Sequence, residues 1–559
     1  MPSELDRKYD EVLAGKIGAG GPFIIERDAL GRAYVGNFPA TLPGLFETFC
    51  ALHGATEALV AGEERLSFAA LDARSTQLAR VLAGSWGVSK GDRVAIAMRN
   101  CPAWIVSYMA IVKAGGIATL INGWWQPDEM RHGLELSAPE LIIADAPRAQ
   151  RLEAGGCTIP TVSLPIELPL DGALAPLLAR TDEADLPEIL PEDDATILFT
   201  SGSTGLAKGA VSTHRAVTTG TYAYALSLSV LLGIKERDND PPKNPPRTLV
   251  NVPLFHVTGE VPVMLNSFVI ARCMVLMPKW DAGEALRLIE REQITYFVGV
   301  PTMSLELMQH PDRAKYDLST LTDIAAGGAP RPVAHVKRLE ESFTGAQPAL
   351  GYGLTETNAA GTGNFWSNYH DKPASSGRAQ QPFVEIAILG EGDAHLPRGE
   401  RGEIAIRTAA NIRGYWQDAA ATQAAFTADH YIRTGDVGYL DEDGYLFIVD
   451  RKKDIIVRGG ENIAAQEVEA AIYAHPSVSE AAVFGVPDER LGEVPAAVIW
   501  CETEPVDEAA LREFLGQRLA QFKLPSYIWF AGAPLPKLGT GKIDKVSLRT
   551  HYRARAAAA

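Results

Sequence analysis

The sequence predicts an α/β protein with a large N-terminal domain and a small α+β C-terminal domain, and three observations indicate this. The 559 residues are too many for one hydrophobic core, so at least two domains are expected. From residue 66 onward, short apolar runs alternate with amphipathic segments, which is the pattern of layered α/β structure. After residue 450 the predicted helices and strands become shorter, as in a compact α+β domain of common size.

Hydrophobic periodicity defines the elements of the first domain. Ser67 is a suitable N-cap for a helix whose apolar face includes Leu71, Leu78 and Leu82. Apolar runs predict strands at residues 93–97, 118–121, 141–144, 195–199, 248–254 and 294–300. Helical patterns predict helices at residues 104–113 and 281–293. Residues 1–45 carry no diagnostic pattern and are expected to form an arm on the body of the protein.

The same patterns divide the chain at residue 450. The N-terminal domain is predicted to span 1–450, with its core from about residue 45, and the C-terminal domain 451–559, with its core at about 466–543. Within the second domain we expect short helices at 466–473 and 507–521 and short strands at 481–486, 496–500 and 527–530. The charged run from Asp450 to Asp454 lies at the boundary.

Composition excludes several classes of protein. A net charge of −17 argues against a nucleic-acid partner, which would require a basic face. The five cysteines are scattered and lack metal-ligand spacing, as in a reducing compartment. The first ten residues lack an apolar signal core, and the longest apolar run, Val261–Met277, is interrupted by Asn266 and Arg272. We therefore expect a cytoplasmic protein without a transmembrane segment; a homodimer is left open.

A loop rich in glycine and hydroxyl groups follows the apolar run at 195–199. It reads Thr200-Ser201-Gly202-Ser203-Thr204-Gly205-Leu206-Ala207-Lys208-Gly209. Glycines let backbone N–H groups approach an anion, hydroxyls donate further hydrogen bonds, and lysine adds a positive charge. The Walker A pattern does not fit, because Lys208 is followed by glycine rather than by a hydroxyl residue. The sequence therefore predicts a polyphosphate loop of another kind.

Further motifs carry groups suited to a nucleotide. In Gly351-Tyr352-Gly353-Leu354-Thr355-Glu356, the tyrosine ring can stack on a purine, Thr355 can bond an α-phosphate oxygen, and Glu356 is a hard oxygen ligand for magnesium. Asp436 follows a glycine and can accept bonds from both ribose hydroxyls. His256 ends a strand, where ligand-facing residues gather in α/β folds.

In their order along the chain, these motifs resemble those of the adenylate-forming enzymes, which include acyl- and aryl-CoA synthetases, luciferases and peptide-synthetase adenylation domains. The resemblance covers residues 66–543. Two prolines usual in the family are replaced by Ala207 and Ala465, which changes only local stiffness. The family fold implies an N-terminal domain of two sheets plus a small β-barrel-like part, and a mobile C-terminal domain.

The resemblance also implies roles for individual residues. The catalytic set comprises Lys542, Lys208, Thr355, Glu356 and His256, with Glu356 and Thr200 on the metal and Lys453 as the hinge. The ATP/AMP site comprises Thr200, Ser201, Gly202, Ser203, Thr204, Gly205, Gly327, Gly328, Ala329, Gly351, Tyr352, Gly353, Thr355, Asp436, Arg451 and Lys542. The acyl pocket comprises His256, Val257, Thr258, Val300, Gly328 and Gly353, and Gly459 and Gly460 line the coenzyme A channel.

The implied activity is a two-step ligation that uses Mg2+, ATP and coenzyme A. A carboxylate first gives acyl-AMP and pyrophosphate; the C-terminal domain then rotates, and coenzyme A takes the acyl group. The small apolar residues of the acyl pocket favour a medium- or long-chain fatty acid or another hydrophobic monocarboxylate. The alternatives are an aryl acid of the benzoate or cinnamate type and transfer to a carrier protein. A luciferase-like oxygenase and a catalytically dead binder are less well supported, the latter because the charged site residues are intact.

Overall fold

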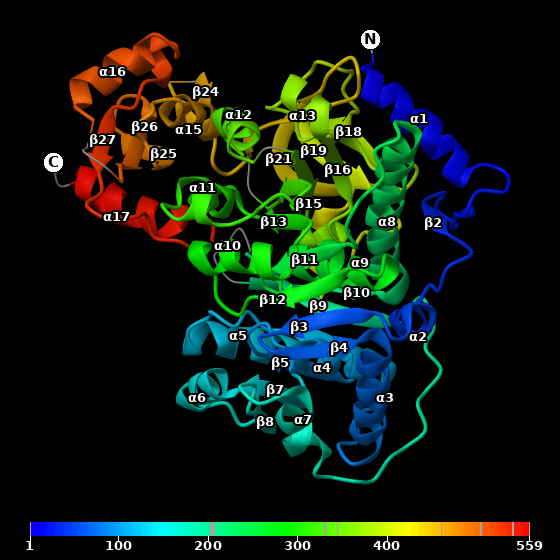
Figure 1. Cartoon of the computed structure of the whole chain (residues 1–559). Helices are drawn as coiled ribbons and strands as arrows, with labels where there is room; N and C mark the ends of the chain where they lie inside the picture. Colours follow the sequence, from blue (N-terminus) through cyan, green and yellow to red (C-terminus); the bar gives the residue numbers. More distant parts are fainter. Residues whose placement is uncertain are drawn as a thin grey trace.

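The computed structural model describes residues 2–201, 207–328, 331–343, 345–459, 461–502, 506–538 and 541–557. The N-terminal part contains two large sheets with helices between and around them, and the C-terminal part forms a smaller lobe beside the second sheet (Figure 1). The layered arrangement follows from strands that are apolar on both faces and must be covered on both sides.

The first sheet has seven strands, and its parallel core carries the glycine-rich loop at one side. In spatial order the strands are β20 (Gly414–Tyr415), β10 (Ala207–Thr213), β9 (Asp194–Ser201), β6 (Ile117–Leu120), β5 (Arg93–Ala97), β7 (Leu141–Asp145) and β8 (Thr161–Leu164). Strands β9, β6, β5, β7 and β8 are parallel, whereas β10 runs antiparallel to β9 and β20. Helices α5 (Pro127–Ser137), α6 (Ala146–Ala154) and α7 (Leu170–Leu178) pack on this sheet and its edge.

The second sheet has nine strands and carries most of the predicted nucleotide motifs. Its strands are β17 (Arg378–Ala379), β16 (Gly361–Phe365), β15 (Gln347–Gly353), β14 (Asp323–Ala326), β13 (Tyr296–Gly299), β11 (Arg247–Val250), β12 (Cys273–Leu276), β3 (Glu57–Ala61) and β4 (Glu64–Ser67). The strands from β15 to β3 are parallel. Outer helices are α10 (Ala282–Arg291), α11 (Pro301–Gln309), α12 (Val333–Ser342) and α13 (Trp366–Asp371), with 3-10 turns η2 (Arg313–Lys315) and η3 (Thr355–Thr357).

A layer of shared helices joins the two sheets. It comprises α2 (Leu42–His53), α3 (Phe68–Gly84), α4 (Pro102–Lys113), α8 (His214–Arg237), the π-helix η1 (Gly259–Leu265) and α9 (Asn266–Val269). Their buried side chains belong to one large core that reaches Ile96 in the first sheet and Val250 in the second. By length and composition α8 could cross a membrane, but 78% of its most apolar window is buried within the protein, which accounts for that composition.

The N-terminal arm packs on the body, as the sequence indicated. It contains α1 (Glu4–Ile17), β1 (Ile25–Arg27) and β2 (Ala33–Val35), and α1 lies along α8 (Figure 1). Asp6 is the main anchor: its carboxylate accepts bonds from Arg378 and Tyr445, at 3.0 and 2.8 Å. The pattern of residues 1–17 did not reveal this helix, because only Val12, Leu13 and Asp6 of α1 are buried.

A four-stranded antiparallel sheet leads into the C-terminal lobe. Its strands are β18 (Glu385–Leu389), β19 (Gly402–Arg407), β21 (Ile432–Leu440) and β22 (Leu446–Arg451), with η4 (Glu391–Asp393) and α14 (Ala419–Ala425) alongside. The lobe itself has β23 (Ile456–Arg458), β24 (Glu461–Ile463), β25 (Glu480–Asp488), β26 (Gly492–Trp500), β27 (Tyr527–Phe530), α15 (Ala465–Tyr473), α16 (Glu508–Gly516), η5 (Gln521–Lys523) and α17 (Lys545–Ala557).

The predicted elements recur, with changes at their ends. The helix over 68–84 has Ser67 as its N-cap and buries Leu71, Leu78 and Leu82. Strand β27 coincides with the predicted run at 527–530. The predicted helix over 507–521 is wrong in length: α16 ends at Gly516, and a separate 3-10 turn follows at Gln521–Lys523. The apolar run at 261–277 is not one element but the end of η1 followed by α9 and β12.

Candidate active site

The flanks of the glycine-rich loop place Lys208 close to Glu356. Strands β9 and β10 pair with Thr200 opposite Lys208. The ammonium of Lys208 lies 5.0 Å from the centre of the Tyr415 ring, and the Tyr415 hydroxyl donates to Glu356 Oε1 at 3.0 Å. Tyr415 thus lies between a cation and a carboxylate that the sequence assigned to phosphate and metal. The loop residues Gly202, Ser203, Thr204 and Gly205, and the side chain of Ser201, lie outside the described residues.

The Gly351–Gly353 segment forms the end of β15, and its last position has no room for a side chain. A Cβ on Gly353 would lie 2.2 Å from the carbonyl oxygen of Ala359, so only glycine fits there. Strand β15 ends directly before η3, which begins at Thr355. The Tyr352 hydroxyl donates to Asp436 Oδ2 at 2.7 Å, so this bond links β15 to β21.

Asp436 is a buried carboxylate at the centre of a polar group whose arginine is exposed. Strand register places it opposite Arg451, whose Nε lies 3.3 Å from Asp436 Oδ1. Burial raises the pKa of Asp436, while the Arg451 charge and the Tyr352 hydroxyl act in the opposite direction. The two residues assigned to ribose, Asp436 and Arg451, are therefore brought together, and both carboxylate oxygens already have protein partners.

Lys542 reaches this group from the C-terminal lobe. A Cβ on Gly328 would lie 3.3 Å from Lys542 Cε and 3.4 Å from its Nζ, and Gly328 has a φ of +74°, which favours glycine. Burial lowers the pKa of Lys542 to about 8; the positive charge of Arg451 lowers it further, and Asp436 opposes the shift. The lysine thus shares one electrostatic environment with Asp436 and Arg451.

His256 lies beside the same lysine. The expectation that His256 ends a strand is wrong: β11 ends at Val250, and His256 lies in the loop that follows it. Its Nδ1 accepts a weak bond from the Thr258 N–H at 3.4 Å. Burial lowers the pKa of His256 to about 3, and the charge of Lys542 adds to the effect, so the imidazole is neutral at pH 7. Gly259 is required for this turn, since a Cβ there would lie 2.1 Å from the carbonyl oxygen of Pro253.

Within the residues that the structure describes, the lysine loop has a small set of contacts with the N-terminal domain. Thr302 Oγ1 donates to the carbonyl oxygen of Gly541 at 3.4 Å, and Val300 lies against Gly541. Lys537 pairs with Glu306 of the N-terminal domain at 3.0 Å and with Glu480 of its own lobe at 2.9 Å. Among the acyl-pocket residues, Val257 and Val300 are buried, and Val300 contacts the lysine loop.

Two groups of assigned residues lie apart from this centre. Lys453 is exposed in the turn between β22 and β23, where the N–H of Asp454 donates to Arg451 O at 2.9 Å. Gly459, assigned to the coenzyme A channel, is exposed, and a Cβ there would lie 3.3 Å from a methyl carbon of Leu491. Ala329 and Gly460 lie outside the described residues.

The sequence reasoning missed two tyrosines. Tyr415 lies between Lys208 and Glu356 only because β20 pairs with β10, so no local pattern identifies it. Tyr224 of α8 lies 3.7 Å from a Cβ placed on Gly351 and donates to Ala359 O at 2.9 Å. It comes from α8, a helix to which the sequence motifs assign no site residue.

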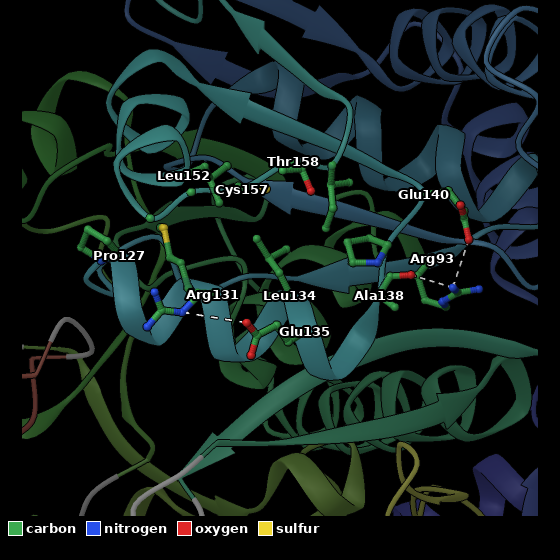
Figure 2. Close-up of a pocket in the computed structure, with 15 residues that line it drawn as sticks. Arg93, Pro127, Arg131, Leu134, Glu135, Ala138, Glu140, Leu152, Cys157 and Thr158 are labelled. Carbon is green, nitrogen blue, oxygen red and sulfur yellow. Dashed lines mark hydrogen bonds and ion pairs between the residues drawn. The ribbon is translucent and has the colours of Figure 1, made fainter.

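Another cavity, of about 420 Å³, lies outside this site (Figure 2). It is bounded by α5, the end of α6 and the segments before β7 and β8, with Cys157 and Leu134 on its walls. Its charged side chains have partners, since Arg93 pairs with Glu140 at 3.2 Å and Arg131 with Asp128 at 2.7 Å. Nothing in its lining calls for a charged ligand.

Comparison with known proteins places the chain in a family. Residues 46–416 match the model of the AMP-binding enzyme family and residues 467–542 that of the AMP-binding enzyme C-terminal domain. The long-chain-fatty-acid–CoA ligase FadD13 of Mycobacterium tuberculosis is 34% identical over 495 residues, covering 88% of this chain and 94% of its own. Feruloyl-CoA synthase of an Amycolatopsis species is 33% identical over 494 residues, covering 88% and 95%.

Solved structures agree with this placement. The o-succinylbenzoate coenzyme A synthetase of Bacillus subtilis in complex with ATP and magnesium has a TM-score of 0.77 at 27% identity, covering 90% of this chain and 99% of its own. The chain therefore belongs to the AMP-binding enzyme family, and the resemblance inferred from its motifs is confirmed.

Proposed function

We propose that this protein is an AMP-forming acid–CoA ligase: a carboxylate and ATP give acyl-AMP and pyrophosphate, and coenzyme A then gives acyl-CoA and AMP. The observation that carries the proposal is the position of Lys542. A lysine from the C-terminal lobe lies at Gly328, beside Asp436 and Arg451, where the motifs place the nucleotide. A partly buried cation at this point stabilises the charge that develops during adenylyl transfer.

The other assigned residues have complementary roles. Lys208 neutralises phosphate charge, Asp436 and Arg451 hold the ribose, and Thr355 bonds the α-phosphate. Neutral His256 separates the carboxylate from the nucleotide without placing a second positive charge beside Lys542. The apolar wall formed by Val257 and Val300 excludes water from the acyl-AMP.

The residues around Glu356 fit a magnesium ion bound together with the nucleotide. Glu356 Oε1 accepts a hydrogen bond from the Tyr415 hydroxyl, which leaves Oε2 for a ligand. Thr200, the other residue assigned to the metal, lies on β9. In the part of the chain that the structure describes, no cluster of three acidic, histidine or cysteine side chains could hold a metal alone. This agrees with magnesium held by one carboxylate and by the phosphates, whose charge it reduces.

The acyl group is proposed to be hydrophobic and to carry one carboxylate. Val257 and Val300 are buried and apolar, and His256, the one ionisable residue assigned to the pocket, is neutral. A second carboxylate would therefore find no cation among these residues. A fatty acid suits this environment, in line with the long-chain-fatty-acid–CoA ligase activity for which the mycobacterial relative is named.

An aryl acid is the second candidate. Tyr224 lies close to Gly351 at the position where the acyl and adenylate parts meet, and its flat ring can pack against an aromatic acid. The feruloyl-CoA synthase relative supports this reading to the same extent as the fatty-acid relative supports the first, since their identities are 33% and 34%.

The deciding experiment measures AMP and pyrophosphate release from Mg-ATP with fatty, aryl and dicarboxylic acids, with and without coenzyme A. Release with fatty acids that coenzyme A accelerates is the expected result, and acyl-CoA should be detected as product. Release with aryl acids alone selects the second candidate. Adenylation without any effect of coenzyme A contradicts the ligase proposal and indicates a carrier protein as acceptor.

A further inference from the structure

Arg331 is a buried arginine whose guanidinium has no carboxylate partner in the described parts of the chain, and its described polar neighbour is the Tyr369 hydroxyl. It follows the Gly327–Gly328 wall and precedes α12, and it is 5% exposed. None of its three guanidinium nitrogens makes a hydrogen bond of normal geometry within those parts. Burying a cation without a partner is strongly unfavourable, so such a group calls for an anion.

Two further buried polar groups lie at the same place. His335, in the first turn of α12, is 5% exposed, and its Nδ1 makes no hydrogen bond to any described group. Tyr369 of α13 is fully buried; its hydroxyl interacts with Arg331, whose guanidinium lies 5.8 Å from the centre of its ring, and makes no hydrogen bond of normal geometry to any described group. Burial lowers the pKa of His335 to about 4, and the charges of Arg338 and Arg331 contribute, so the guanidinium lies near the imidazole.

The backbone adds to this cluster of donors. Helix α12 has ten residues and no side chain caps its N-terminus; the His335 N–H donates to Pro332 O at 2.9 Å, and the N–H groups before it are those that a helix N-terminus offers to an anion. The positive end of a helix, a guanidinium, an imidazole and a phenol together form the donor set of a phosphate site.

The cluster lies where the two domains meet. The His335 ring lies 5.9 Å from the ring of Tyr473, which belongs to α15 of the C-terminal lobe, in an edge-on arrangement. Helices α12 and α15 are neighbours in this view of the molecule (Figure 1). A displacement of the lobe would remove Tyr473 from His335, so access to the cluster depends on the position of the lobe.

We propose that Arg331, His335, the Tyr369 hydroxyl and the N-terminus of α12 bind a phosphate group, which the nucleotide end of coenzyme A supplies once the C-terminal lobe has moved. The assignment of coenzyme A rests on the proposed function. That substrate carries a phosphate monoester and a diphosphate far from its thiol, and none of the residues assigned above accounts for their binding. Free pyrophosphate offers the same chemistry and is the other source of such a group.

Direct binding tests the site without relying on turnover. The probes are adenosine 3′,5′-bisphosphate, which is the nucleotide end of coenzyme A, and pyrophosphate, each titrated calorimetrically into the full chain. Arg331→Met removes the charge while filling the same space, and Lys337→Met, on the exposed side of α12, is the control with the same change in charge. Loss of a charged hydrogen bond should weaken bisphosphate binding about ten- to hundredfold in Arg331→Met and leave it unchanged in Lys337→Met.

Each result decides between the sources. Weaker binding of the bisphosphate confirms the coenzyme A assignment, whereas weaker binding of pyrophosphate alone overturns that assignment and keeps the phosphate site. Equal affinities of the wild type and Arg331→Met for both probes overturn the site. Should the wild type bind neither probe, Tyr473→Ala, which uncovers His335, must bind at least one; continued absence of binding also overturns the site.

Kinetics give an independent measurement. Arg331→Met should raise the KM for coenzyme A about tenfold or more and leave the exchange of ATP with pyrophosphate unchanged. Pantetheine, which lacks these phosphates, should be used equally by the wild type and the variant; a variant defect that is the same with pantetheine contradicts the site. Absence of acyl-CoA from the wild type with every acid would count against the proposed function, while the titrations would still decide the phosphate site.

Discussion

The two halves of the candidate active site are held in different ways. The half in the N-terminal domain is fixed by strand pairing: Asp436 lies opposite Arg451 across two paired strands, and the Tyr352 hydroxyl ties it to a third. The half that carries Lys542 is held against the domain by a 3.4 Å bond from Thr302, a contact with Val300 and an ion pair from Lys537.

This difference separates binding from chemistry. Paired strands form one cooperative unit and keep the nucleotide groups in place, whereas a loop on a separate lobe can leave at small cost. Lys542 also favours leaving for an electrostatic reason: its depressed pKa of about 8 shows that burial beside Arg451 disfavours its charged form. Bound phosphate would supply the opposite charge, so the nucleotide itself favours the closed arrangement.

Removing the movable half should have the largest effect. Lys542→Ala is expected to slow adenylation about 10²- to 10³-fold, the usual effect of deleting one group that stabilises developing charge. Conversion of supplied acyl-AMP to acyl-CoA should be largely preserved, because the rotation expected of the C-terminal domain would take the lysine out of the site before that step. Pyrophosphate exchange and thioester formation are measured separately, with Lys523→Met as a distant control; equal losses in the two steps would contradict the role of Lys542.

Weakening the fixed half should act on binding. Asp436→Asn is expected to raise the KM for ATP about 10- to 100-fold, because a charged acceptor near the ribose and Arg451 is lost. Tyr352→Phe removes only the 2.7 Å bond to Asp436 and should have a smaller effect on the same constant. Initial rates over a range of ATP concentrations give both values. An unchanged KM in Asp436→Asn would show that this carboxylate does not hold the nucleotide.

Restricting the turn that connects the two domains should slow only the second reaction, the formation of the thioester. Lys453→Pro restricts the exposed turn between β22 and β23 and is expected to slow thioester formation about tenfold or more while sparing adenylation. Lys452→Pro is not a suitable control, because the Lys452 N–H donates to Gly435 O at 2.8 Å. Lys453→Ala is the suitable one, and a proline variant with a normal second step would exclude a hinge at this residue.

The titration of Lys542 gives the smallest and most graded test. The charged form is present below the pKa of about 8 and is lost as the pH rises through it, so adenylation should fall above pH 8, up to tenfold per pH unit. An unburied lysine would keep its charge beyond pH 10. Comparing the pH profile of pyrophosphate exchange with that of Lys542→Arg, which stays charged, isolates this group; identical profiles would assign the decline to another residue.

Much of the fold could be predicted from local patterns. The helix capped by Ser67 and strand β27 lie where periodicity placed them, because a buried face at fixed spacing imposes one type of element. The arm helix α1 escaped prediction because only three of its residues are buried, so its apolar periodicity is weak. The break between α16 and η5 escaped prediction for a different reason. The helical spacing of apolar residues continues past Gly516, whereas the backbone stops being α-helical there.

The candidate site could likewise be predicted from the sequence only in part. The sequence alone determined the family, the glycine positions and the charged residues, because backbone clearance and charge type are properties of single residues in a short motif. Only the tertiary structure decided which of them meet: Tyr415 between Lys208 and Glu356, Lys542 beside Asp436, and Arg331 with His335 under Tyr473. These contacts join segments far apart in the chain, and no local pattern encodes the pairing of strands and lobes that creates them.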